Sequence, residues 1–259
     1  MKKTSTLLLA LFSVLIAGAQ TADDVIAKYI DALGGIDKVK SIQSLYMEGV
    51  AVGPNGSEIT TTTYKVQGKL YRQEIDFGMG KFGSIITDKG GWVANPRNGG
   101  AYEAAPAEMV ASQQTEMDCT SPLIDYSAKG YSAELVGQET IEGKTCYNIK
   151  LTNKAGKSTN YFIENKEWHL IRSSTKGAGG MFGRGGGGGN RGGGGGGQAG
   201  PPAEEIVMNT DYSDFKKTKE GFVYPATITR PGMGGRGMAT TIEKYEVNIK
   251  VDPKLFQPE

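Results

Sequence analysis

The chain has 259 residues, of which 29 are basic and 28 acidic, so its formal net charge is +1. This near-neutral balance argues against binding to nucleic acid or anionic lipid through bulk charge. One histidine and two separated cysteines cannot supply a usual zinc ligand set, and we expect no metal and no cofactor.

Residues 1–20 have the pattern of a secretory signal peptide. Lys2 and Lys3 precede an apolar run over 7–16, and small residues lead to a cleavage point after Ala19. The run is too short for a permanent membrane anchor; the alternative is a buried N-terminal helix. No cysteine follows Ala19, so lipid attachment there is not expected. Cleavage would leave 27 basic and 28 acidic residues, giving a soluble periplasmic protein of charge −1.

The mature chain is predicted to open with a helix over 21–33. Thr21 and Asp24 fit a capping pair, and Gly34 and Gly35 end the helix. One face carries an apolar stripe of Val25, Ile26, Tyr29, Ile30 and Leu33. A second short helical turn runs through Ile36, Val39 and Ile42.

Turn-rich segments then divide the chain into strands. Five strands are predicted between residues 45 and 96, separated by GPNGS, QGK, GMGK and DKGG. The segment PAEMVASQQTEMD is a predicted helix with Pro106 in its first turn. Four strands follow at 131–139, 145–152, 157–164 and 167–175.

The last fifty residues show three further alternating patterns. Their apolar positions are Ile206, Met208, Thr210 and Tyr212; Phe222, Tyr224, Ala226 and Ile228; and Tyr245, Val247, Ile249 and Val251. A period of two is typical of half-buried antiparallel strands. Residues 21–259 are therefore predicted to form one mainly β domain of about 11–12 strands. We expect a continuous sheet over 45–96 and 131–251 that curves around the first helix.

Two features leave alternatives open. Cys119 and Cys146 could form a disulfide in an oxidising compartment, or Cys146 could be a small strand residue facing away from Tyr147, Ile149 and Leu151. The tract over 177–200 holds 16 glycines in 24 residues, and we predict a disordered loop over 177–202. An RNA-binding RGG segment is disfavoured because the tract has few arginines and the protein is exported.

The up-and-down strand order predicts that this tract and the loop PGMGGRG share one rim of the sheet. Met and Phe side chains on flexible backbone adapt to apolar cargo. We therefore hypothesise a mobile flap, with idle loops as the alternative; its gating residues are Met181, Phe182, Met233 and Met238.

No catalytic arrangement is evident in the sequence. His169 is predicted on a strand between Trp168 and Leu170, where an exposed polar position is more common than a general base. The acidic pairs fit a helix first turn and a loop exit rather than a two-carboxylate site. We expect no enzymatic activity.

Several segments together resemble a known family: TADDVIAKYIDALGGIDKVKSI, SPLIDYSAKGYSAELVG, GKTCYNIKL, YFIENKEWHLIR, TDYSDF, GFVYPATITR and KVDPKLFQP. In order and spacing they resemble the outer-membrane lipoprotein-sorting proteins of the periplasm, in the branch of Lol-type carrier relatives abundant in Bacteroidetes-like bacteria. The resemblance implies an unclosed antiparallel barrel plugged by helices, with a cavity for acyl chains.

Two functions follow from these observations. The first is a non-catalytic, monomeric carrier for lipid or lipoprotein acyl chains, with an envelope membrane protein as candidate donor or acceptor. The second is an envelope interaction protein with a filled core and partner-binding glycine loops. The candidate ligand-binding residues, each of which could also be ordinary core, are Tyr71, Ile75, Phe77, Tyr147, Ile149, Leu151, Met208, Tyr212, Phe222, Tyr224, Ile228, Tyr245 and Val247.

Overall fold

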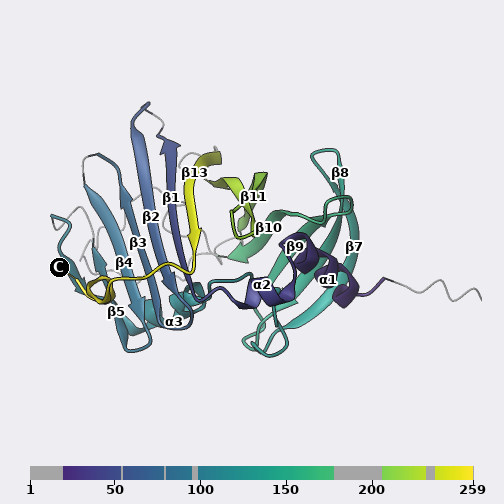
Figure 1. Ribbon diagram of the computed structural model, residues 1–259, viewed down its shortest axis with the longest axis horizontal. Coiled ribbons are helices and arrows are strands. Elements are labelled where there is room, and N and C mark those ends of the chain that lie inside the picture. Colours follow the sequence, from purple (N-terminus) through teal and green to yellow (C-terminus); the bar gives the residue numbers. More distant parts are fainter. Residues whose placement is uncertain are drawn as a thin grey trace, which may run out of the picture.

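A 13-stranded antiparallel sheet dominates the computed structural model, which describes residues 20–53, 55–78, 80–94, 99–177, 206–231 and 237–258 (Figure 1). The predicted signal segment and nearly all of the glycine tract lie outside these ranges. The strand order is β6-β5-β4-β3-β2-β1-β13-β12-β11-β10-β9-β8-β7. The chain is thus an up-and-down meander whose first and last strands pair with each other, which leaves β6 and β7 as the edges of an unclosed barrel.

The first half of the sheet contains six strands. They are β1 (Ser44–Val52), β2 (Glu58–Val66), β3 (Leu70–Asp76), β4 (Lys81–Thr87), β5 (Gly90–Ala94) and β6 (Tyr102–Ala104). The first five confirm the predicted strands and their four turns. The three-residue β6 was not predicted, because so short a strand carries no readable alternation.

Seven strands form the second half. They are β7 (Ser132–Ile141), β8 (Lys144–Thr152), β9 (Ser158–Glu164), β10 (Leu170–Gly177), β11 (Ile206–Lys217), β12 (Val223–Pro231) and β13 (Gly237–Val247). The last strand was predicted too late in the chain. A bulge at Glu243 interrupts the alternation, and Asn248, at φ 56°, ends the strand before Ile249 and Val251.

Among the described residues, five helical segments accompany the sheet: α1 (Ala22–Ala32), α2 (Ile36–Lys40), α3 (Ala107–Gln113) and the 3₁₀ turns η2 (Gln114–Met117) and η4 (Pro253–Phe256). The three predicted helices are therefore present, the middle one ending as 3₁₀. None of the described helices has the length and hydrophobicity that a membrane crossing needs.

The predicted cap of α1 is formed in full. The Asp24 backbone N–H donates to the Thr21 hydroxyl at 3.2 Å, and the Thr21 backbone N–H donates to the Asp24 carboxylate at 2.9 Å. These hydrogen bonds lower the pKa of Asp24. The cap fixes where the helix begins and hence which face reaches the sheet.

Replacing this cap should weaken the fold modestly. We expect Thr21→Ala to lower the free energy of unfolding by about 1 kcal/mol, because one helix N–H loses its acceptor. Thr21→Ser keeps a hydroxyl and serves as the control in urea denaturation. Equal stability of the Ala variant and the wild type would contradict this role.

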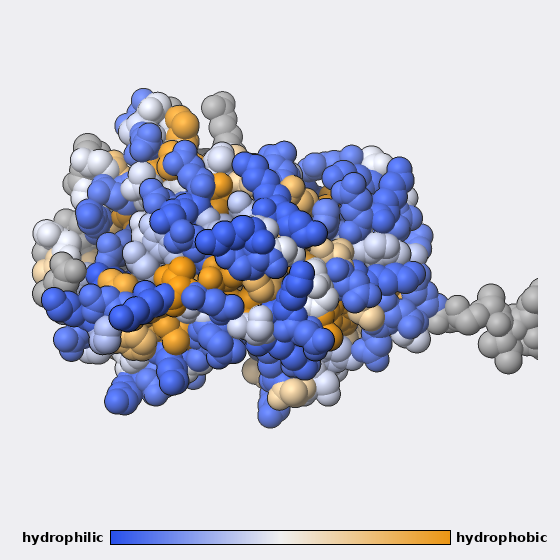
Figure 2. Space-filling view, viewed as in Figure 1, coloured by the Kyte–Doolittle hydropathy of each residue, from blue (hydrophilic) through white to orange (hydrophobic). Residues whose placement is uncertain are grey.

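The C-terminal segment crosses the face of the sheet opposite to the one that α3 covers. η4 packs on β3 and β4, where the buried Arg72 guanidinium donates to the backbone oxygens of Leu255 and Gln257 at 3.3 and 3.4 Å. In Figure 2 a hydrophobic band follows the path of this segment across the drawn side, with hydrophilic residues around it. The segment thus covers part of β3 and β4 on this face.

Candidate functional site: the inner face of the sheet

Alternate residues of the strands point to the face that the helices cover, which we call the inner face. Cross-strand pairs fix the alignment, as in Ile149↔Tyr161, Ser173↔Thr210 and Tyr212↔Ile228. The opposite, outer face receives the residues in between. This geometry places every strand residue of the predicted ligand-binding set on the inner face.

One half of the inner face is filled. α1 and the segment 123–126 pack on β7 to β10 in a hydrophobic cluster that includes Val25, Ile26 and Tyr29 from the helix, with Ile149 and Leu151 from the sheet. Ile30 and Leu33 pack at its margin. The apolar stripe of the helix is thus buried against the sheet, as predicted. Ile149 and Leu151 are core residues in this structure.

Beside this cluster, aromatic side chains gather where β12 and β13 meet β1. Phe222 and Val247 are buried with Cys119, and the rings of Tyr224 and Tyr245 stack at 4.3 Å between centroids. Both tyrosine rings are half-buried. They form an apolar wall at the edge of the helix-covered region.

Phenol groups converge on the middle of the inner face. Burial raises the pKa of Tyr29 to about 12 and raises those of Tyr161 and Tyr245 as well, with neighbouring phenols adding to the effect. The Tyr212 hydroxyl lies 3.1 Å from that of Ser173. Tyr29, Tyr161 and Tyr245 therefore stay protonated at neutral pH, and their phenols are hydrogen-bond donors within an otherwise apolar surface.

The other half of the inner face is mixed in character. α3 and η2 bring Val110 and Met117 onto Tyr71 and Ile86. The middle of the same strands presents polar side chains at inner positions, namely Thr61, Thr63, Gln73 and Ser84. The sequence prediction named apolar positions alone and missed this polar stripe, although the same alternation contains it.

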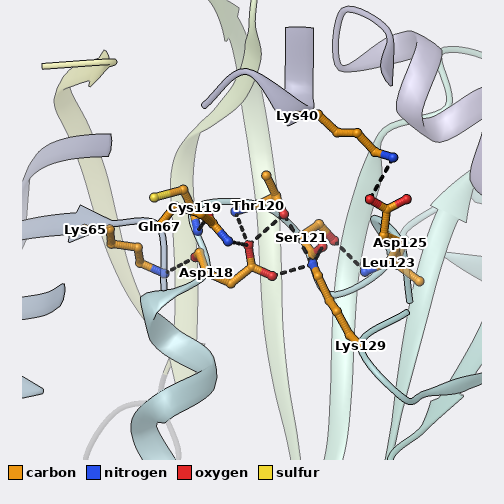
Figure 3. A network of polar contacts seen from close by, with 10 residues as sticks. All are labelled: Lys40, Lys65, Gln67, Asp118, Cys119, Thr120, Ser121, Leu123, Asp125 and Lys129. Atoms are coloured by element: carbon orange, nitrogen blue, oxygen red, sulfur yellow. Dashed lines mark hydrogen bonds and ion pairs between the residues drawn. The ribbon is translucent and has the colours of Figure 1, made fainter. Parts of the chain in front are cut away.

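The segment that crosses the base of the inner face is pinned by a polar network centred on Asp118 (Figure 3). The Asp118 carboxylate accepts hydrogen bonds from Gln67 at 3.2 Å and from the Thr120 backbone N–H at 3.0 Å, and it pairs with Lys129. Lys65 donates to the Asp118 backbone oxygen at 3.2 Å. The network ties the segment to the β2–β3 turn.

This environment determines the ionisation of Asp118. Burial alone would raise the pKa of its carboxyl, but Lys129 and the Thr120 donors outweigh burial and hold that pKa below its ordinary value. The carboxylate is therefore charged at neutral pH. No sequence pattern singled out this residue beyond its place at the end of a predicted helix.

The predicted site residues fall into two groups. Tyr71, Ile149, Leu151, Phe222, Ile228 and Val247 are buried, whereas Ile75, Phe77, Tyr147, Met208, Tyr212, Tyr224 and Tyr245 are half-buried. Tyr147 stacks on Trp168, whose other contacts include the Lys28 ammonium of α1. The half-buried residues, apart from Tyr147, are those that a ligand could reach without displacing α1.

The predicted gating residues are only partly described. Met181, Phe182 and Met233 lie outside the described residues; Met238 is half-buried on β13, opposite Arg230. β10 ends and β11 begins at the same edge as the β12–β13 connection. We call this edge the open rim.

The turn between β9 and β10 corrects the prediction for His169. Trp168 has φ 61° and β10 begins only at Leu170, so His169 precedes the strand. Ligand atoms of Glu164, Glu167 and His169 lie within 4.8 Å of one another. Glu164, however, accepts hydrogen bonds from the Lys166 and Glu167 backbone N–H groups. These contacts make Glu164 the cap of the β9–β10 turn.

The two cysteines are free, and both are buried. Cys119 lies in the inner-face cluster with Phe222, whereas Cys146 packs with Phe162 and Ile171 on the outer face. Burial raises the pKa of the Cys119 thiol to about 11. The two cysteines therefore form no disulfide with each other, and Cys146 is a small strand residue that faces away from Tyr147.

The fold can be compared with known structures. No model of a protein family matches the chain, and no curated protein matches it by sequence. A DUF1329 family protein from Desulfovibrio piger superposes with a TM-score of 0.54 at 16% identity, covering 90% of this chain and 97% of that one. LolA superfamily protein NE2245 from Nitrosomonas europaea gives 0.53 at 12% identity, covering 93% and 99%.

A third neighbour is a putative outer membrane lipoprotein-sorting protein domain from Vibrio parahaemolyticus, with a TM-score of 0.50 at 8% identity over 91% of this chain and 97% of that one. The chain has the fold of the LolA-type lipoprotein-sorting proteins. This LolA-type fold confirms the unclosed antiparallel barrel that the family resemblance implied. At such low identity the likeness establishes the fold alone.

Proposed function

We propose that this protein is a periplasmic, non-catalytic carrier that holds the acyl chains of a lipid or lipoprotein against the inner face of its sheet. The observation that carries the proposal is the half-buried aromatic and apolar surface, including Met208, Tyr212, Tyr224 and Tyr245, that lies beside the helix-filled core in a LolA-type fold. The predicted signal sequence over residues 1–20 supports export to the periplasm.

The physical basis is the transfer of hydrocarbon out of water. Each buried CH₂ gains about 0.8 kcal/mol, so an acyl chain needs a long apolar surface but no covalent chemistry. The protonated phenols at the middle of the face would donate hydrogen bonds to the ester or amide carbonyl at the polar end of the cargo. A monomer is sufficient for this task, and a membrane protein of the envelope would load or unload it.

A fluorescent fatty acid tests the proposal. Added below its micelle concentration, it should gain fluorescence with the purified protein and be displaced by unlabelled fatty acid. A protein that binds none of it would instead favour an envelope interaction protein with a filled core. The extensive packing of α1 on Ile149 and Leu151 is the observation that favours this second function.

A further inference from the structure

The outer face of β7 to β11 contains a hollow of about 680 Å³ near the open rim. Two adjacent rows of cross-strand partners build it. One row runs through Glu134, Lys150, Asn160 and Ser174, the next pairs Lys176 with Val207, and Ser158 also lines the hollow. The hollow is separate from the inner face, since these positions alternate with those that point inward.

Its charge is locally basic although the protein as a whole is nearly neutral. Lys150, Lys157 and Lys176 line the hollow together with a single acid, Glu134. Glu134 lies 3.9 Å from Lys150, and both side chains are well exposed. Within the described part of the chain, neither Lys157 nor Lys176 forms an ion pair with an acid. The hollow therefore presents uncompensated positive charge beside hydroxyl and amide donors.

Apolar side chains flank these lysines. Val136 and Val207 line the hollow and are each 53% exposed. They are two of the five large hydrophobic residues that stand out as exposed in the described chain. Exposed valines among lysines fit a surface whose partner is anionic at its boundary and apolar just beneath it.

We infer that this surface docks the protein on an anionic lipid bilayer. Lys150, Lys157 and Lys176 contact headgroup phosphates, and Val136 and Val207 reach the boundary of the acyl region. The surface lies at the open rim, so docking brings the inner face next to the membrane. The inference goes beyond the proposed carrier function and does not depend on it, because vesicle binding needs no cargo.

Vesicle co-sedimentation tests the inference with the full mature chain. We expect binding to vesicles containing phosphatidylglycerol, no measurable binding to pure phosphatidylcholine, and loss of binding as salt rises. Neutralising all three lysines (K150Q, K157Q and K176Q together) should weaken partitioning roughly 100-fold, since each basic side chain contributes about fivefold near an anionic surface. Circular dichroism checks that the variant is folded.

A matched control removes the same charge elsewhere. Lys216, Lys217 and Lys219 are exposed at the opposite end of the sheet, in and beside the β11–β12 turn. Their triple Gln variant should bind like the wild type. Equal losses in the two triple variants, equal binding to both vesicle types, or no binding by the wild type would each overturn the inference. Displacement by low-millimolar inorganic phosphate would also overturn it, by indicating a soluble-anion site.

The same variants separate this inference from the carrier function. In vesicle-free solution, the K150Q, K157Q and K176Q variant should bind fluorescent fatty acid as the wild type does. Vesicle binding without fatty-acid binding would contradict the carrier while supporting the docking surface.

Discussion

Placing a carboxylate on the inner face should abolish most fatty-acid binding. Met208 is half-buried on β11, opposite Thr175 of β10, and points inward beside the tyrosines. In Met208→Asp, an acyl chain lying on this face would have to desolvate a charge without a partner. We expect affinity for the fluorescent fatty acid to fall by about 30-fold or more, equivalent to roughly 2 kcal/mol.

The neighbouring residue provides the control. Val207 belongs to the same strand but points to the outer face. In vesicle-free solution Val207→Asp should leave fatty-acid affinity within about twofold of the wild type, because an exposed surface charge costs little. Equal effects of the two substitutions would show that the inner face is not where the acyl chain lies.

The second large effect concerns the segment around Asp118 that crosses the base of the inner face. Asp118→Asn keeps the shape of the side chain but leaves the partly buried Lys129 without its carboxylate partner. We expect the free energy of unfolding to fall by about 2–3 kcal/mol at neutral pH, measured by urea denaturation. Asp125→Asn, which removes the exposed ion pair with Lys40 at 2.8 Å, should cost less than about 1 kcal/mol.

Acid should erase the difference between Asp118→Asn and the wild type. Because the folded-state pKa of Asp118 is lowered, its contribution to stability is present above the ordinary aspartate pKa of about 3.9 and is lost as pH falls through the folded-state value. The wild type should therefore lose stability in acid more steeply than the variant. Parallel acid profiles would contradict a role for the Asp118 carboxylate.

The strands were largely predictable from the sequence because their signals are local. Alternation and turn residues located β7, β8 and β9 to within a few residues. These signals failed at β13, because the bulge at Glu243 interrupts the alternation that Thr240 and Ile242 would otherwise continue. They also failed at the start of β10, because Trp168 has a left-handed backbone conformation and the strand begins only after it. Bulges and left-handed residues are hard to predict from the alternation of apolar residues alone.

The division of the inner face into filled and accessible parts was not predictable. Ile149 and Met208 have the same alternating signature, yet α1 buries the first and leaves the second half-exposed. Which strands a helix covers depends on contacts between distant segments. The Asp118–Lys129 pair likewise depends on how a loop crosses the barrel, although the Asp-Cys-Thr sequence does permit the local turn in which Thr120 donates to Asp118.

Native mass spectrometry of the protein purified from its native host tests the proposed carrier function most directly. We predict mass adducts that match lipid or lipoprotein acyl species and that are lost on delipidation or in Met208→Asp. Unliganded protein throughout, together with no uptake of added fatty acid by the wild type, would contradict the carrier function.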